Sequence, residues 1–315
     1  MSRFGPAIKR TISVAIIACV GYFFWRTFRQ NWSTLSGLEL HPRYPFVALA
    51  LGVVLVSALL LTFAWHLSVN SLSDRGHRIK FSQSIATVNT SSLTKYVPGK
   101  IWSYALQMYW LTTLGFSKSL VLYVNLVNLA IALLSNVLLG LVCWLVASDK
   151  FVGIASLALA GLLVLDLACI QFSGPVLDAA VKLLNRAFKR NVSYYRISRK
   201  LMLQLHGVHL LAAFTSGFSV FLLSFGVGYS VDARLGFLVT ASSLIADVAG
   251  YLAFMVPGGL GVREGLMYAM LGGIKSGSIG LVLPLAARVA SMSSDIVIGA
   301  VALKLLQGWT KPKPE

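Results

Sequence analysis

Three long stretches of the sequence contain no charged residue, and they constrain the fold more strongly than any other feature. They cover residues 44–73, 119–148 and 201–231. At 1.5 Å per residue, each stretch is long enough to cross about 30 Å of hydrocarbon as a single helix. The composition agrees, since 57% of the residues are hydrophobic and only 12% are charged. Soluble domains carry about twice that share of charge. The sequence therefore predicts an all-α, polytopic membrane protein.

Three further apolar stretches bring the predicted number of full membrane spans to about six. They cover residues 11–25, 151–171 and 276–307. The first is short, but the long basic side chains at its ends can reach the headgroups. The other two contain ionisable residues, among them Asp166 and Arg288. A charge at the bilayer centre costs about 2.5–3.5 kcal/mol on insertion scales, so we expect these side chains to face protein or a wet cavity.

Basic residues dominate the charge of the chain, with 27 Lys and Arg against 10 Asp and Glu. A basic excess is typical of nucleic-acid-binding proteins, but much of this one lies in a single loop between predicted spans. Its basic residues are Lys182, Arg186, Lys189, Arg190, Arg196, Arg199 and Lys200. The positive-inside rule places such a loop in the cytoplasm. With six full spans both termini are also cytoplasmic, and we expect a multi-pass protein of the bacterial inner (plasma) membrane without a nucleic-acid partner.

The tripeptide Val-Pro-Gly occurs twice, at residues 97–99 and 256–258, which are 159 residues apart. Proline lacks a backbone donor and crowds the preceding turn, while glycine admits backbone angles closed to other residues. Each site therefore predicts a broken helix. Irregular backbone inside a membrane needs protein or water partners, so the breaks indicate a cavity. The predicted helix-breaking or cavity-lining residues are Pro98, Gly99, Pro257, Gly258, Gly259 and Gly261.

The two breaks lie in segments 81–118 and 235–275, which the six spans leave unassigned. Each segment must return to its own side of the membrane, so we predict two re-entrant hairpins. Three full spans separate the hairpins, which makes residues 11–171 and 172–307 candidate inverted repeats within one domain, 1–315. One alternative is a pair of unrelated proline-broken helices. Another is a chain of eight or more membrane helices, if the hairpin arms span fully.

Charged residues gather around both breaks. The predicted ligands of a lipid phosphate are Lys95, Lys100, Arg263 and Arg288. Helix N-termini after each Pro-Gly would assist them, because their free amides favour anions. The predicted charge partners or proton-coupling groups are Asp166, Asp247, Glu264 and Asp295. Cations outnumber acids near the breaks, which favours an anionic ligand, but purely structural ion pairs explain the same residues equally well.

No metal or cofactor signal is present in the sequence. Cys19, Cys143 and Cys169 fall inside predicted spans, and none belongs to a CxxC pair. His206 and His209 have helical spacing, but no acid or cysteine accompanies them in the sequence, so polar packing is favoured over a metal site. The glycines that follow the second proline do not form a dinucleotide fingerprint. We expect neither a metal nor a cofactor.

Two segments resemble the signatures of the lysylphosphatidylglycerol synthase transmembrane family, also called the flippase-like domain. The first is Lys-Tyr-Val-Pro-Gly-Lys-Ile-Trp at 95–102, followed by Gly-Phe-Ser at 115–117. The second is Pro-Gly-Gly-Leu-Gly-Val-Arg-Glu-Gly at 257–265, followed by Ala-Ala-Arg at 286–288. In bifunctional relatives this domain moves an aminoacylated phospholipid between leaflets, and a separate soluble domain makes that lipid. The resemblance implies the translocating half alone, since the longest hydrophilic stretch, 173–200, is too short for a transferase.

Together these observations predict a protein that binds and translocates an anionic phospholipid or a polyprenyl-phosphate-linked lipid by alternating access. The alternative is a non-catalytic membrane scaffold, or a subunit of a lipid-modifying or glycosyl-transferring enzyme, which makes such an enzyme a candidate partner. A membrane transferase with Glu264 or Asp247 as general base is a further hypothesis. Because no paired nucleophile supports it, we expect no enzymatic activity.

Overall fold

The computed structural model describes residues 29, 41–73, 76–96, 101–147, 152–171, 173–188, 193–253, 256–271 and 277–310. Every element in these ranges is a helix, which confirms the predicted all-α class. The predicted first span, 11–25, lies outside the described residues. So do the first helix-breaking pair, Pro98 and Gly99, and the adjacent Lys100.

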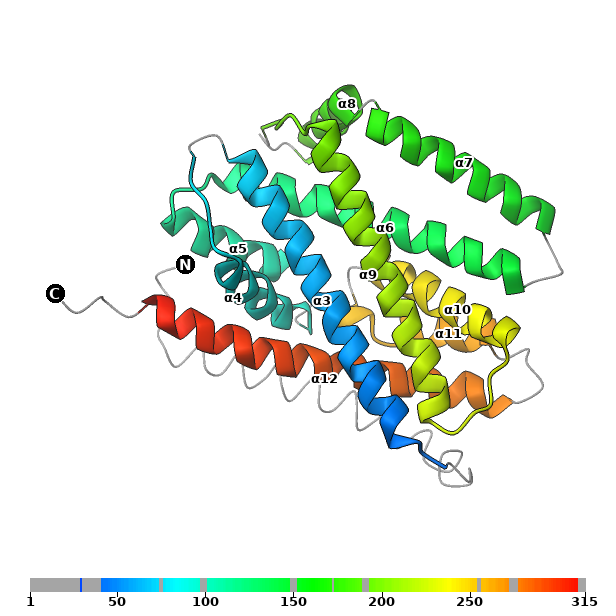
Figure 1. Cartoon of the computed structure of the whole chain (residues 1–315). Helices are drawn as coiled ribbons and strands as arrows, with labels where there is room; N and C mark the ends of the chain where they lie inside the picture. The colour runs from blue at the N-terminus through cyan, green and yellow to red at the C-terminus, as the bar shows by residue number, and fades with distance from the viewer. Residues whose placement is uncertain are drawn as a thin grey trace.

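Five helices in the described part of the chain are long and apolar enough to cross a membrane (Figure 1). They are α3 (Tyr44–Leu72), α6 (Lys118–Ala147), α9 (Arg199–Gly226), α10 (Ala233–Leu252) and α12 (Gly277–Thr310). Four of them, α3, α6, α9 and α12, match predicted spans. In the first three an uncharged apolar run fixes both the length and the ends of the membrane helix. The protein is therefore a multi-pass membrane protein. The fifth, α10, was predicted only as a hairpin arm.

The helices α7 (Val152–Gln171) and α8 (Ser173–Phe188) connect α6 to α9. The sequence predicted α7 as a full span, but its described apolar stretch, Ser156–Ala168, is shorter than those of the other five. At about 1.5 Å per residue this stretch measures about 20 Å. The total number of membrane spans therefore stays a prediction.

Both segments that contain Val-Pro-Gly are interrupted helices. The first consists of α4 (Phe81–Ser92), a short 3₁₀ helix η1 (Leu93–Tyr96) and α5 (Ile101–Thr113). Helix α4 has 12 residues and α5 has 13, so each measures about 18–20 Å and is too short to cross the hydrocarbon alone. Re-entrance of this segment remains a proposal, but the arm lengths favour it.

The second interrupted segment consists of α10, a 3₁₀ turn η2 (Pro257–Gly259) and α11 (Val262–Leu271). Gly258, Gly259 and Gly261 have φ angles of +56°, +67° and +81°, in the left-handed region that glycine adopts without strain. A Cβ on Gly259 would lie 2.8 Å from the Cα of Gly250 in α10, so η2 folds tightly back on that helix. Helix α10 therefore ends before Pro257, and α11 begins after it.

The order α3, α4, η1, α5, α6 is followed by the same order of elements in α9, α10, η2, α11, α12. Helix α6 begins at Lys118 and α12 begins at Gly277, which repeats the 159-residue spacing of the two Val-Pro-Gly sequences. The packing partners also correspond. Helix α4 packs on α12 as α10 packs on α6, and η1 touches η2.

Helices α3 and α9 form the largest helix-to-helix contact and run in opposite directions (Figure 1). The backbone amide of Arg43, before α3, donates to the carbonyl of Gly226 at the end of α9 over 2.9 Å. Further along, the hydroxyl of Ser57 donates to the carbonyl of Ala212 over 2.8 Å. The first bond joins the start of α3 to the end of α9, and the second joins the middles of the two helices, as expected for an antiparallel pair.

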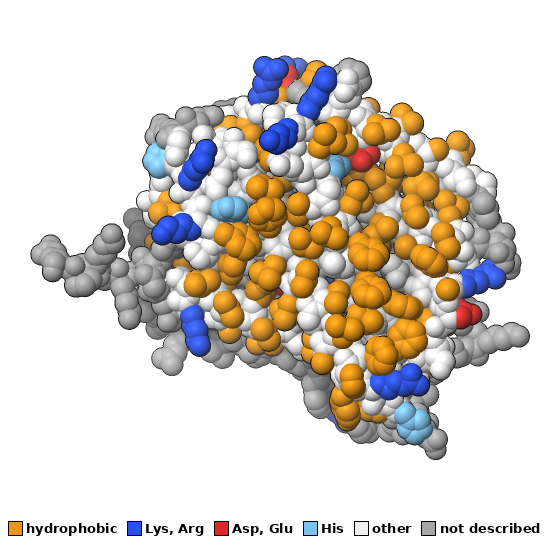
Figure 2. Space-filling model, viewed as in Figure 1, with side chains coloured by type: hydrophobic (Ala, Val, Ile, Leu, Met, Phe, Trp, Pro, Cys, Tyr) orange, Lys and Arg blue, Asp and Glu red, His pale blue; other side chains and the backbone are white. Residues whose placement is uncertain are grey.

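Apolar side chains cover the centre of the face shown in Figure 2, and most of the Lys and Arg side chains lie toward its edges. Large side chains with high exposure include Phe214, Phe218 and Phe63, on α9 and α3. Exposed aromatic groups of this size are costly in water and favourable in lipid. The exterior is therefore that of a membrane protein.

Candidate functional site

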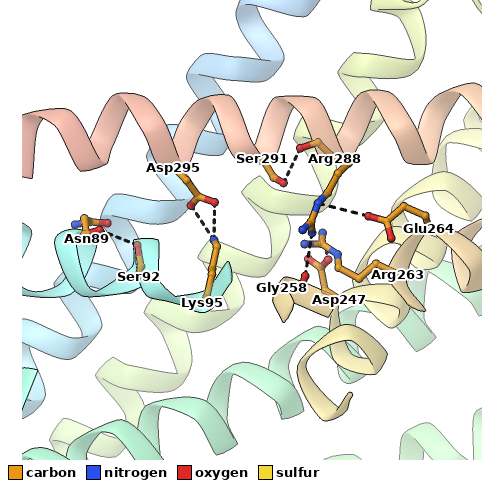
Figure 3. Close-up of polar contacts among 10 residues, drawn as sticks. All are labelled: Asn89, Ser92, Lys95, Asp247, Gly258, Arg263, Glu264, Arg288, Ser291 and Asp295. Carbon is orange, nitrogen blue, oxygen red and sulfur yellow. Dashed lines mark hydrogen bonds and ion pairs between the residues drawn. The ribbon is translucent and has the colours of Figure 1, made fainter. Parts of the chain in front are cut away.

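Charged side chains from both interrupted segments and from α12 meet in the interior of the bundle (Figure 3). Lys95 lies on η1 and reaches across to Asp295 on α12. Its Nζ is 2.8 Å from Oδ1 and 2.7 Å from Oδ2 of the carboxylate. The lysine side chain is 40% exposed and that of the aspartate is 15% exposed. This pair therefore joins the first broken helix to the last helix of the chain.

A second pair lies entirely within the other interrupted segment. Arg263, in the first turn of α11, pairs through Nη2 with Oδ1 of Asp247 on α10. The stem of the arginine runs directly over Gly250, where a Cβ would collide with it. Gly250 thus leaves room both for the arginine and for η2. Sequence reasoning did not assign this role to Gly250, although its position one helical turn after Asp247 was visible.

The third cation, Arg288 on α12, is the most deeply buried of the described cations in the site, with its side chain only 6% exposed. Its Nη1 donates to the backbone carbonyl of Gly258 in η2 over 3.0 Å. Its Nε lies 3.6 Å from Oε1 of Glu264 on α11. Arg288 therefore connects the last helix to the second break.

Glu264 has a second partner that explains its position. Its Oε2 accepts a hydrogen bond from the backbone amide of Gly261 over 2.7 Å. A glutamate three residues after the N-cap residue, which here is Gly261, commonly closes the N-terminus of a helix in this way, and its charge complements the helix dipole. Glu264 therefore has two roles: it caps the N-terminus of α11 and it neutralises Arg288.

The described site balances three cations against three carboxylates, since each of the three pairs joins one of each. The sequence-based expectation of a cationic excess depended on Lys100, which lies outside the described residues. The structure thus brings together Lys95, Arg263 and Arg288 as predicted, and it also gives each of them an acidic partner. Mutual neutralisation is how a membrane interior tolerates such groups.

A small cavity of about 20 Å³ lies beside the second and third pairs. Its lining includes Arg263, Glu264, Arg288, Ser243 and Pro284. A cavity of this size holds about one water molecule. A phosphate group would therefore need the carboxylates to move aside.

Asp166, the remaining acid predicted for the site, lies elsewhere. It is buried on α7, where its Oδ1 is 2.8 Å from Nε2 of His206 on α9. No acid lies near His206 in the sequence, and the fold brings one to it from α7. Forty residues separate the two in sequence, so only the packing of α7 on α9 brings them together. His209 contacts Oδ1 of Asn128 on α6 over 3.0 Å, in agreement with the predicted polar packing.

Neutral hydrogen bonds hold the rest of the interior together. Asn128 donates to Ser68 on α3 over 3.0 Å, and Asn125 donates to Gln107 on α5 over 2.8 Å. Gln107 in turn donates to Ser91 on α4 over 2.9 Å. Interhelical bonds of this kind stabilise helix packing in lipid. Asn125 and Asn128 of α6 therefore serve helix contacts.

Comparison with known proteins agrees with the two signature segments. The family model described as the lysylphosphatidylglycerol synthase TM region matches residues 10–299. A search of curated proteins found no match. The matched range includes both interrupted segments and all three ion pairs. Because it covers most of the chain, the protein belongs to the family of the lysylphosphatidylglycerol synthase TM region.

Proposed function

We propose that the protein translocates an anionic phospholipid or a polyprenyl-phosphate-linked lipid between the leaflets of the membrane. One observation carries the proposal. Cations from both broken segments and from α12 converge at one place, and each is held by a carboxylate rather than by apolar packing. A lipid phosphate presents the same charge as a carboxylate and can replace it on an arginine or lysine. The proposal involves no chemical conversion of the lipid.

Alternating access would require the two interrupted segments to open toward opposite leaflets. The antiparallel packing of α3 and α9 supports this arrangement. A two-fold axis that relates two antiparallel helices must run perpendicular to them. If α3 and α9 span the membrane, this axis lies in the membrane plane, which is the geometry of inverted-repeat transporters. We therefore propose that residues 11–171 and 172–307 are inverted repeats and that the broken segments are re-entrant.

Orientation is part of the proposal. The basic residues from Lys182 to Lys200 support a cytoplasmic position for the connection between α7 and α9, and both termini then face the cytoplasm of a cell with this protein in its inner membrane. A Ser193→Cys variant tests this, because Ser193 is exposed. An impermeant maleimide should label this cysteine only after the membrane is opened. Labelling in intact cells would show that the protein has the opposite orientation.

Transport is testable with phosphatidylcholine vesicles that contain the purified protein and a fluorescent phosphatidylglycerol. Addition of dithionite bleaches the probe in the outer leaflet, so the rate of further bleaching measures translocation. The double variant Arg288→Met, Glu264→Gln removes one ion pair without leaving a lone charge. We expect it to fold and to translocate the probe at least ten-fold more slowly than the wild type.

A matched control removes a different ion pair. Lys182 and Asp178 form an exposed pair on α8, 2.6 Å apart and away from the site. The variant Lys182→Gln, Asp178→Asn should translocate at the wild-type rate. If the Arg288 and Glu264 double variant also retains the full rate, Arg288 is a structural residue and not a phosphate ligand.

A second probe, a fluorescent polyprenyl phosphate, distinguishes the two lipid classes.

The second candidate function is a scaffold for a lipid-modifying or glycosyl-transferring enzyme. The small size of the cavity favours it, because about 20 Å³ does not accommodate a headgroup. Under this hypothesis the wild-type protein accelerates translocation of neither probe, and a membrane enzyme of lipid metabolism copurifies with it. Binding of lipid at the ion pairs is then not required.

A further inference from the structure

A second cavity lies at one end of the bundle, where α3 ends and α9 begins. Its volume is about 340 Å³, whereas the cavity beside the central ion pairs measures about 20 Å³. Pockets that bind small molecules have volumes of about 300–1,000 Å³. The lining comes from the last residues of α3, from the connecting segment 193–198 and from the first two turns of α9. This cavity is therefore large enough to hold a lipid headgroup.

Two cations and several neutral polar groups line this second cavity. The cations are Arg196, on the connecting segment, and Lys200, in the first turn of α9. Hydroxyl and amide groups come from Ser71, Ser198 and Gln204. The lining that the structure describes contains no carboxylate, whereas each described cation of the central site has an acidic partner. Such a lining favours an anion, and both arginine and lysine bind phosphate groups.

The connecting segment holds Arg196 at the cavity from both sides. Before it, the backbone carbonyl of Tyr195 accepts a hydrogen bond from the hydroxyl of Tyr123 on α6 over 2.7 Å. After it, the side chain of Ile197 is 3% exposed and packs in the core. The next residue, Ser198, caps the N-terminus of α9. The backbone at the arginine is therefore already ordered, so ligand binding does not have to order it.

The lengths of α3 and α9 place this cavity at the depth of the lipid phosphates. The two helices have 29 and 28 residues, so each is about 42–44 Å long at about 1.5 Å per residue. The hydrocarbon is about 30 Å thick, and the bilayer with its headgroups is about 40–45 Å thick. The end of α3 and the start of α9 therefore lie in the headgroup layer. Figure 2 shows Lys and Arg side chains along the edge where these two helix ends lie in Figure 1.

We propose that this cavity binds the phosphate of an anionic lipid from the adjacent leaflet, with Arg196 and Lys200 as its ligands. Leu72 and Leu201 add apolar surface to the lining, which suits the glycerol and first methylene groups of a lipid better than a free phosphate ion. Basic pockets between membrane helices are a recurrent means of headgroup recognition. The inference does not rest on the proposed function, because a translocase and a scaffold can both hold a lipid at this position.

The test measures lipid binding at the cavity itself, in detergent micelles where translocation cannot occur. A bimane fluorophore is attached at Gln204→Cys in the full chain, whose three native cysteines are first replaced by alanine. Phosphatidylglycerol that is brominated close to its headgroup is added to dodecyl maltoside micelles, and its bromine atoms quench the bimane on contact. Quenching should saturate at a low fraction of lipid, and its midpoint measures the affinity. Brominated phosphatidylcholine, which has no net charge, should require a higher fraction.

Two variants of this labelled chain change the cavity, and a third is a matched control. Arg196→Gln, Lys200→Gln removes both cations and should raise the midpoint at least about ten-fold, because charge-assisted hydrogen bonds are lost. Ser71→Trp fills the cavity without a change of charge and should also raise the midpoint. The control Arg78→Gln, Arg186→Gln removes two exposed cations that do not line the cavity. It should shift the midpoint less than about two-fold, because salt screens charges that do not touch the ligand.

All five substituted positions are exposed, so we expect every variant to fold. An unchanged midpoint in Arg196→Gln, Lys200→Gln overturns the proposal, as does an equal shift in the control, since the lipid would then respond to surface charge alone. An unchanged midpoint in Ser71→Trp places the lipid outside the cavity and also overturns it. Inorganic phosphate should displace the lipid no better than chloride at the same ionic strength. If phosphate displaces it more effectively, the site recognises a free phosphate ion and the assignment to a lipid is wrong.

Discussion

The two interrupted segments follow one plan but differ in what they contribute to the site. The arms of the first have 12 and 13 residues, and its described charge in the site is a half-exposed lysine that reaches away to α12. The arms of the second have 20 and 10 residues, and it supplies Arg263, Asp247 and Glu264. It also receives Arg288 on a backbone carbonyl of the break itself. The second segment thus contains most of the buried charges of the described site. The first segment contributes Lys95, which reaches the site through its ion pair with Asp295 on α12.

Burial decides the energetic consequence of this difference. The side chains of Arg288 and Glu264 are 6% and 16% exposed, whereas that of Lys95 is 40% exposed. Removing one member of a buried pair leaves an uncompensated charge, and an ion pair contributes less to stability when one of its side chains is partly exposed, as that of Lys95 is. The second break should therefore be far more sensitive to substitution than the first.

The largest effect is expected for Arg288→Ala. It leaves Glu264 buried near the carbonyl of Gly258 without the cation that both contact. We expect a loss of about 3–5 kcal/mol in the free energy of unfolding, the cost of breaking one buried ion pair. Denaturant unfolding of the purified protein in mixed micelles measures it. The double variant with Glu264→Gln should recover most of the loss, and an equally unstable double variant would contradict the pairing.

A smaller effect is expected for Gly259→Ala. A left-handed backbone costs a residue with a side chain about 1–3 kcal/mol, and here the Cβ would also meet the backbone of Gly250. Gly261 has a left-handed φ but open space around it, and Gly265 has open space without a left-handed φ. Thermal unfolding should therefore rank Gly259→Ala as most destabilised, then Gly261→Ala, with Gly265→Ala near the wild type. Equal melting of the first two would show that η2 does not press on α10.

The smallest effect is expected for Lys95→Met. Partly exposed ion pairs contribute up to about 1 kcal/mol, so this variant should unfold close to the wild type. The proposed function nevertheless gives Lys95 a share in phosphate binding, so translocation of the fluorescent lipid should slow. Strong destabilisation by Lys95→Met would erase the contrast between the two breaks. Unchanged stability together with an unchanged rate would remove Lys95 from the site.

Sequence patterns predicted the parts of this fold that depend on local composition. Helices α3, α6 and α9 begin and end within a few residues of the predicted boundaries. The length of an uncharged apolar run matches the thickness of the hydrocarbon, so the run marks where the helix starts and stops. Helix α10 was harder to recognise as long enough to span, since Asp247 interrupts its apolar pattern. Its acid is tolerated because Arg263, from the next helix, neutralises it.

The partner of each charged residue could not be predicted from the sequence. Arg288 and Asp295 lie two turns apart on α12, yet one pairs with α11 and the other with η1. Similarly, Asp166 meets His206 only because α7 packs on α9. Such contacts depend on how helices are arranged in three dimensions. Periodicity along a single helix contains no information about them.

The pair between Lys95 and Asp295 has a consequence for the biogenesis of the protein. The two residues are 200 positions apart in the chain. At about 5–20 residues per second, the ribosome needs about 10–40 s to reach the aspartate after it has made the lysine. During this time the first broken helix is already made while its partner helix has not yet been synthesised. The ion pair at the first break can therefore form only after the last membrane helix has been made. A chain that stalls or is truncated before α12 leaves Lys95 without Asp295. The unfinished membrane interior of such a chain is then exposed to quality-control proteases.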